Sequence, residues 1–277
     1  MPKKLSSQEI QHYRDNGYVG AVPVLTSEEV RHFRSGLEAF EERSGKTLDF
    51  PERSKSHLLF DWADAIVHHP AVLDAVEDLI GPDILVYHLT VHIKQPGTDN
   101  FIVWHQDDDY FHLDPAEHVT AWVALSNATE AAGCMRMIPG AHKKGLIRHT
   151  EEPAPDHLIR RGKGIYGRWT DADGELVPVP AGSMSLHHTH TPHASGPNRG
   201  ADRRIGVGVS YIPAHARQRF EPTNSVLLVR GEDRHGHFPH EERLQASESE
   251  AARAAHTAAY KTYMAAVIDR KETPDAA

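Results

Sequence analysis

Residues 101–107 read FIVWHQD, an apolar run of β-forming residues that ends in a histidine and an aspartate two positions apart. Residues two apart on a strand point to the same face, with Cα atoms ~6.5 to 7 Å apart. An imidazole and a carboxylate in this arrangement can converge on one cation. The stretch therefore predicts a strand that ends in two metal ligands, His105 and Asp107.

The segments around this strand also have β character. Residues 84–94 (ILVYHLTVHIK) alternate, which places Val86, His88, Thr90, His92 and Lys94 on one largely polar face. Further short β-rich runs, bounded by Gly and Pro, cover residues 119–127, 133–139, 175–180, 183–188 and 204–213. Many short strands without helices between them favour an antiparallel barrel or jelly roll over a doubly wound parallel sheet.

Helices are predicted at both ends of the chain. Residues 6–9 (SSQE) and 26–29 (TSEE) have the capping-box pattern, and each precedes apolar residues at helical spacing. A third helix is predicted over 70–79, and the Ala- and Glu-rich stretch 239–271 is predicted to be helical. Without a repeat or a dividing linker, residues 1–277 are predicted to form a single domain, mainly β with flanking helices.

Composition excludes several classes of partner. The 277 residues carry a net charge of −9, which disfavours nucleic acid and anionic membrane as partners. No apolar stretch approaches the ~18 residues of a membrane span, and the N-terminus lacks the apolar region of a signal peptide. The one cysteine, Cys134, cannot form an intramolecular disulfide, so we expect a cytoplasmic protein. No oligomeric state is predicted.

The chain contains 22 histidines, so the metal site has competing candidates. A second pair with the same spacing, His112 and Asp114, precedes Pro115 and is interpreted as loop. A third ligand can come from His187, His188, His190 or His193, and periodicity does not choose among them. Two imidazoles and one carboxylate with open positions are typical of non-haem Fe(II) oxygenases. Arg204, eleven residues after His193, is suited to hold the carboxylate of a cosubstrate.

Four linked motifs carry a family resemblance, strongest over residues 84–213. They are WHQD (104–107), AWVAL (121–125), GCM (133–135) with IPGAHK (138–143), and HASGPN (193–198) followed by Arg204. In these segments the chain resembles the phytanoyl-CoA dioxygenase-like branch of the Fe(II)/2-oxoglutarate dioxygenases. That family folds as a double-stranded β-helix, a cupin-like jelly roll.

The resemblance implies iron at His105, Asp107 and His193. It also implies that Arg204 and Ser195 receive the distal carboxylate of 2-oxoglutarate, and that Lys94 and Trp122 contact this cosubstrate. Each of the last three has an alternative role: Lys94 as a solvated strand-end charge, Trp122 as a core aromatic and Ser195 as a turn residue.

The implied reaction is hydroxylation of an unactivated C–H bond in a small molecule, with O₂ consumed and succinate and CO₂ released. The substrate class is an amino acid, a phosphonate, an acyl compound or a natural-product intermediate. One alternative is a metal-binding cupin-type protein without oxygenase activity. Another is a desaturating or cyclising oxygenase that uses the same site, whereas Asp107 disfavours a halogenase.

Two further segments have open interpretations. Residues 142–168 are locally basic and include Arg160 and Arg161, so they form either a solvated loop or a lid that guides an anionic substrate. Residues 108–111 (DDYF) form either a substrate contact or an exposed turn.

Overall fold

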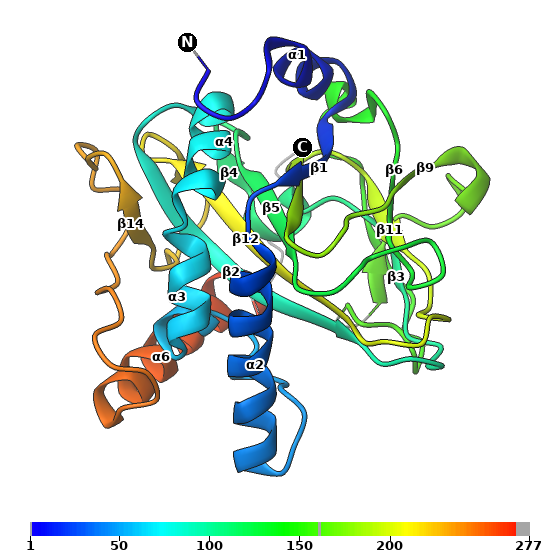
Figure 1. The fold of residues 1–277 in the computed structure, drawn as a ribbon. Helices are drawn as coiled ribbons and strands as arrows, with labels where there is room; N and C mark the ends of the chain where they lie inside the picture. Colours follow the sequence, from blue (N-terminus) through cyan, green and yellow to red (C-terminus); the bar gives the residue numbers. More distant parts are fainter. Residues whose placement is uncertain (1, 160–161, 270–277) are drawn as a thin grey trace.

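The computed structural model describes residues 2–159 and 162–269, and two antiparallel sheets dominate it (Figure 1). The larger sheet has the strand order β1-β10-β5-β12-β2-β14, and the smaller has the order β3-β11-β6-β9. The strands of the larger sheet are β1 (Tyr18–Pro23), β2 (Ile84–Lys94), β5 (Val119–Ala124), β10 (Ser183–His188), β12 (Arg204–Pro213) and β14 (Leu227–Arg230). Those of the smaller are β3 (Ile102–His105), β6 (Met135–Met137), β9 (Glu175–Val177) and β11 (His193–Ser195). The expected antiparallel architecture is confirmed, and strands β1 and β14 of the larger sheet are additions to it.

Helices α2, α3 and α4 pack in front of the larger sheet, where they cover one of its faces (Figure 1). The helical elements before the first long strand are α1 (Ser7–Asn16), α2 (Ser27–Ser44), η1 (Ser56–Leu58), α3 (Asp61–Val67) and α4 (Pro70–Ile80). Both predicted capping boxes are present, with Ser6 and Glu9 before α1 and Thr26 and Glu29 before α2. Elements η1 and α3 are too short to show a periodic pattern in the sequence, so they were not predicted.

The C-terminal helix is shorter than predicted. Helix α6 spans Glu250–Tyr263 and continues as the π-helical turn η5 (Met264–Ile268). The expectation of a helix from residue 239 is wrong, because Glu241 N–H donates to the carbonyl of Val226 in an extended segment. The Ser249 side chain accepts from Ala252 N–H and caps the helix start. No described helix is long and apolar enough to cross a bilayer.

The remaining elements are short. They are α5 (Asp108–Phe111), β4 (Leu113–Asp114), η2 (Ala141–Lys144), β7 (Thr150–Glu151), β8 (Lys163–Gly164), η4 (Asp171–Asp173) and β13 (Arg217–Gln218). Strand β4 pairs with β13, so the loop interpretation is wrong for Leu113 and Asp114. Strand β13 lies about a hundred residues later in the chain, so the sequence around residue 113 could not indicate this pairing. The organisation as a single domain stays a prediction.

Candidate metal centre and its pocket

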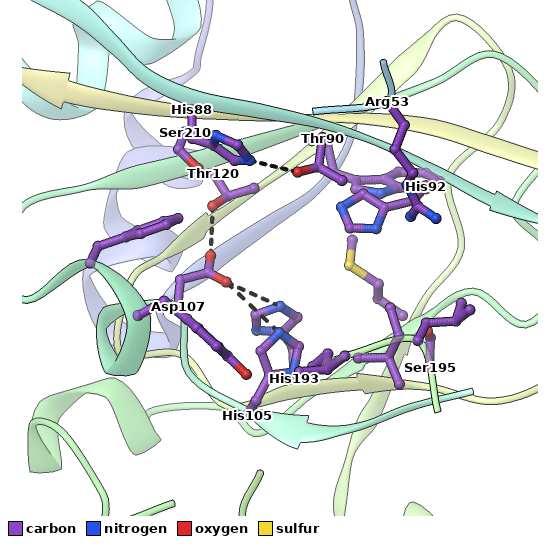
Figure 2. A pocket seen from close by; sticks show the side chains of 18 of the residues that line it. Arg53, His88, Thr90, His92, His105, Asp107, Thr120, His193, Ser195 and Ser210 are labelled. Carbon is purple, nitrogen blue, oxygen red and sulfur yellow. Dashed lines mark hydrogen bonds and ion pairs between the residues drawn. The ribbon is translucent and has the colours of Figure 1, made fainter. Parts of the chain in front are cut away.

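A cavity of about 510 Å³ lies between the two sheets. The predicted polar face of β2 supplies His88, Thr90 and His92 to its wall, and β3 and β11 of the smaller sheet supply His105 and His193. Figure 2 shows these histidines on opposite sides of the pocket, with Asp107 beside His105 and His193. The alternation read from residues 84–94 therefore identified one functional wall.

His105, Asp107 and His193 converge in this pocket. Each offers one ligand atom, and the three atoms lie within 4.8 Å of one another. Oδ1 of Asp107 is 3.8 Å from Nε2 of both His105 and His193. The two histidines face each other because His193 of β11 is the pairing partner of His105 of β3.

The other histidines considered for the third position do not join this group. Nε2 of His190 lies 3.0 Å from Oδ2 of Asp108, and His188 is not among the described residues that line the pocket. His187 does line it, with Nε2 3.3 Å from Oδ2 of Asp107, the carboxylate oxygen turned away from the other two imidazoles. Pairing of the distant strands β11 and β3 thus brings His193 to the site. Sequence periodicity cannot predict which distant strands pair.

The geometric reason given for the His105 and Asp107 pair is wrong. Strand β3 ends at His105, and Asp107 has the helical backbone angles φ −64° and ψ −33° at the start of α5. The two side chains meet because the chain turns sharply after the strand, not because they alternate along it. Gln106 is buried in that turn, where its side chain donates to the carbonyls of Gly145 and His190.

Both imidazoles are held with Nε2 toward the centre of the site. Nδ1 of His105 lies 2.9 Å from the carbonyl of Val103, and Nδ1 of His193 lies 3.0 Å from the carbonyl of Thr191. A carbonyl only accepts, so Nδ1 carries the proton and Nε2 presents its lone pair. Burial lowers the pKa of His105 to about 4 and that of His193 well below its ordinary value, so both rings are neutral near pH 7.

Asp107 completes the donor set as a carboxylate. Its Oδ2 accepts a 2.7 Å hydrogen bond from Oγ1 of Thr120, which leaves Oδ1 toward the two Nε2 atoms (Figure 2). Burial alone would raise the pKa of Asp107, but the facing imidazoles of His193 and His187 hold it well below its usual range. Two neutral nitrogens and one carboxylate oxygen fit a ferrous ion, which prefers this combination with other positions open.

A buried cation lies beyond this centre. Arg204 is 1% exposed, and Nη1 donates to the carbonyl of Gly133, while its Cζ lies 5.1 Å from the centroid of the Trp122 ring. Nε has no hydrogen-bond partner among the described residues. Burial lowers the pKa of Arg204 to about 10, so it stays charged near pH 7. An unpaired buried guanidinium in a pocket fits the carboxylate of a small acid.

Ser195 and Lys94 form a second polar unit next to Arg204. Nζ of Lys94 donates to Ser195 Oγ at 2.7 Å, to the Ser195 carbonyl at 3.0 Å and to the Gly196 carbonyl at 2.6 Å. Lys94 is fully buried, so its interpretation as a solvated charge is wrong. Burial, followed by the charge of Arg204, lowers the pKa of Lys94 to about 6. Ser195 lines the pocket and Lys94 lies behind it.

Trp122 reaches the pocket because the facing strand carries a glycine. A Cβ at Gly206 would lie 1.8 Å from the Trp122 ring, so only glycine leaves space for the indole. Trp122 also packs in a core cluster with Tyr18 and Met135. The cosubstrate and core interpretations of Trp122 are therefore compatible, and Gly206 is a site feature that sequence analysis missed.

The two open segments are resolved in part. Asp108 and Asp109 are buried and are not among the described residues that line the pocket, whereas Tyr110 and Phe111 do line it. Residues 108–111 are therefore not an exposed turn. Arg160 and Arg161 lie outside the described residues. Just before them, residues 157–159 line the pocket.

The residues of the outer pocket were not predicted from the sequence. Arg53 comes from the loop before η1, and Tyr260, Tyr263 and Met264 come from α6 and η5. Arg53 belongs to no motif. The two tyrosines have helical spacing, which indicates a shared face but not what it covers.

Comparison with known proteins supports the same assignment. The family model "Phytanoyl-CoA dioxygenase (PhyH)" matches residues 13–206. A solved structure described as a non-heme monooxygenase, ThoJ in its apo form, is 32% identical, with a TM-score of 0.81 over 92% of this chain and 95% of that one.

Two curated relatives have named reactions. A probable alpha-ketoglutarate-dependent hypophosphite dioxygenase of Stutzerimonas stutzeri is 26% identical over 76% of this chain and 79% of its own. The L-proline trans-4-hydroxylase of Streptomyces griseoviridis is 24% identical over 76% of this chain and 89% of its own. The expected jelly roll and the expected class of 2-oxoglutarate-dependent non-haem iron dioxygenases are confirmed. The chain belongs to the phytanoyl-CoA dioxygenase (PhyH) family.

Proposed function

We propose that this protein hydroxylates an unactivated C–H bond of a small molecule, using Fe(II), 2-oxoglutarate and O₂ and releasing succinate and CO₂. The observation that carries the proposal is the convergence of His105, Asp107 and His193 within 4.8 Å, in the same pocket as the unpaired guanidinium of Arg204. A metal-binding cupin without oxygenase activity has no need of that buried cation.

Each residue has a distinct task in this proposal. His105, Asp107 and His193 hold the iron, with both imidazoles oriented by backbone carbonyls. Arg204 receives the distal carboxylate of 2-oxoglutarate, because its Nε is buried and unpartnered among the described residues. Ser195 and Trp122 line the same part of the pocket, and Lys94 is a positioning residue that fixes Ser195.

The bound iron supplies the activation of O₂ that protein side chains alone cannot perform. The chain's own contribution is orientation and charge. Thr120 donates to Asp107 and fixes which carboxylate oxygen faces the metal. The buried position of Arg204 keeps its charge unscreened by water, so it can align the cosubstrate strongly.

The substrate of this enzyme is a small acid. Two relatives are named for reactions on hypophosphite and L-proline, which both carry an oxyanion group near pH 7. The pocket volume of about 510 Å³ accommodates a small molecule together with 2-oxoglutarate.

The test is a coupled assay of protein loaded with Fe(II), supplied with 2-oxoglutarate, ascorbate and a panel of carboxylic and phosphonic acids. We expect succinate release that depends on the acid and matches a product that has gained one oxygen atom. A product that has lost two hydrogen atoms would show that the reaction is desaturation or cyclisation and not hydroxylation. No succinate with any acid, from protein that binds iron, would overturn the proposal in favour of the cupin alternative.

A further inference from the structure

The pocket contains a second guanidinium, that of Arg53, which the binding of iron and 2-oxoglutarate does not use. Among the described residues that line the pocket, the formally charged ones are Arg53, Asp107 and Arg204. Asp107 faces the metal position and Arg204 faces the cosubstrate. Figure 2 shows Arg53 on the wall with His92, across the pocket from His105 and His193.

Arg53 is buried without an adequate anionic partner. Its side chain is 11% exposed, and the carboxylate nearest to it, Asp49, has Oδ1 3.7 Å from Nη1 and is itself 70% exposed. Nε has no hydrogen-bond partner among the described residues. Burial lowers the pKa of Arg53, which reflects how poorly its charge is compensated. A buried charge of this kind is costly unless a ligand pairs with it.

The backbone holds Arg53 firmly in this position. Val91 N–H donates to the Arg53 carbonyl at 2.9 Å, and Lys55 N–H donates to the Leu89 carbonyl at 2.7 Å. Ser54 between them bridges to Thr90. The loop is thus an added edge on strand β2, and this pairing fixes the backbone from which the Arg53 side chain reaches the pocket.

The charges of the loaded site leave room for one anion. A ferrous ion carries two positive charges, and Asp107 and the 2-oxoglutarate dianion together carry three negative charges. The positive charge of Arg204 brings the sum to zero. Lys94 lies behind the pocket wall, where its Nζ donates to Ser195 and Gly196. Among the described residues that line the pocket, Arg53 is then the cation that neither the metal position nor the cosubstrate uses. Burial, followed by the charges of Arg53 and Arg204, lowers the pKa of His92, so both guanidiniums lie near this ring.

Aromatic and apolar groups fill the other end of the outer pocket. The Tyr263 ring stacks on His88 at 3.7 Å between centroids, and Tyr110, Met264 and Ile268 also line the pocket. His88 precedes Val91, the partner of Arg53, by three residues on β2, so the two ends are roughly 10 Å apart along the strand.

We propose that Arg53 is the receptor for an oxyanion group of the substrate, a carboxylate or a phosphonate, whose apolar remainder extends toward Tyr263. This inference rests on the proposed function and adds to it the residue that binds the oxyanion and the direction in which the rest of the substrate extends. In the bound complex, the two ends of the substrate are held apart by Arg53 and Tyr263, and its middle faces His105 and His193.

The test measures binding without turnover. Protein loaded with Fe(II) and 2-oxoglutarate under nitrogen is titrated in a calorimeter with 3-phenylpropanoate, 2-phenylethylphosphonate and the uncharged 3-phenylpropanamide. We expect the two acids to bind at least about tenfold more tightly than the amide, because a charge-assisted hydrogen bond is lost with the amide. Comparison of the two acids identifies which oxyanion the site prefers.

Variants of Arg53 assign the effect to this residue. Arg53→Gln is expected to weaken binding of the acids about 10- to 100-fold, to leave the amide unchanged and to leave 2-oxoglutarate affinity within about twofold. Arg217→Gln, at a 65% exposed arginine on β13, is the matched control and should change none of these values. Without ligand, Arg53→Met is expected to raise Tm by about 2 °C or more, since it removes a mostly buried charge whose pairing with the exposed Asp49 is weak.

The outcomes separate the two proposals. If wild-type protein fails to bind 2-oxoglutarate in the presence of Fe(II), the proposed function itself fails. If it binds 2-oxoglutarate but the acids bind no better than the amide, or Arg53→Gln leaves their affinity unchanged, the role of Arg53 is overturned. A fall in Tm in both Arg53 variants with unchanged acid affinity would assign Arg53 to structure alone.

Discussion

The metal end of the pocket and its outer end are built from different parts of the chain. Strands β3, β11 and β12 supply the metal end, whose candidate ligands and cosubstrate residues fall within the family match of residues 13–206. The outer end takes Tyr263 and Met264 from a helical segment beyond that match, and Arg53, which lies within the match, from a loop edge. The candidate ligands and cosubstrate residues thus sit on paired strands and on the turn that follows β3, and the groups proposed to face the substrate sit on flanking segments. Changes at the two ends should therefore alter different measurable quantities.

The largest expected effect is at the metal itself. His193→Ala removes one of three ligands, and we expect succinate release to fall roughly 1,000-fold or more, since metal-supplied stabilisation of several kcal/mol is lost. His237→Ala changes an exposed histidine and serves as the control. Substantial activity in the His193 variant would mean that the iron lies elsewhere.

Arg204→Gln should affect the binding of 2-oxoglutarate at the metal end of the pocket and not the binding of substrate at the outer end. We expect KM for 2-oxoglutarate to rise about 100-fold, because a buried charge-assisted pair is lost, while KM for the substrate acid changes little. Steady-state kinetics with each compound varied in turn provides the measurement. Equal rises in both constants would show that the ends are not independent.

Thr120→Val tests support of the metal end without touching a ligand. The change keeps the side chain's shape but removes the hydrogen bond to Oδ2 of Asp107. We expect Fe(II) affinity to fall about 10- to 100-fold, and Thr120→Ser to restore most of it. The measurement is anaerobic metal titration, and an unchanged affinity in the valine variant would remove Thr120 from the account.

The last expected effect concerns stability, through the packing behind the cosubstrate. Gly206→Ala places a methyl group against the Trp122 ring, and we expect a loss of about 1 to 3 kcal/mol in the free energy of unfolding. Gly20→Ala is the matched control, since a Cβ there meets nothing within 4 Å. Denaturant unfolding measures both, and equal stability of the two variants would argue against tight packing of Trp122.

The metal end could largely be predicted from sequence, and the outer end could not. His105 and Asp107 have a recognisable spacing, and alternation along residues 84–94 identified the wall that carries His88, Thr90 and His92. The choice of His193 needed either the family motif or the β11–β3 pairing, because periodicity alone fits three other histidines equally well. The turn at Asp107 shows that a motif can be right when the local geometry assumed for it is wrong.

Arg53 had no such signal. Its burial depends on an isolated bridge between Ser54 and Thr90 and on a helix two hundred residues later in the chain. It belongs to no motif in the sequence, and in the structure it lies between the exposed Phe50 and the short helix η1. Whether a charge is solvated or buried is decided by long-range packing, and this is also why Lys94 was open between two roles.

The most direct test of the account is anomalous diffraction at the iron edge from crystals grown under nitrogen with Fe(II) and 2-oxoglutarate. The account predicts one strong peak bounded by Nε2 of His105, Nε2 of His193 and Oδ1 of Asp107, with a carboxylate of the keto acid on Arg204. An iron peak among other histidines, or 2-oxoglutarate bound away from Arg204, would contradict it.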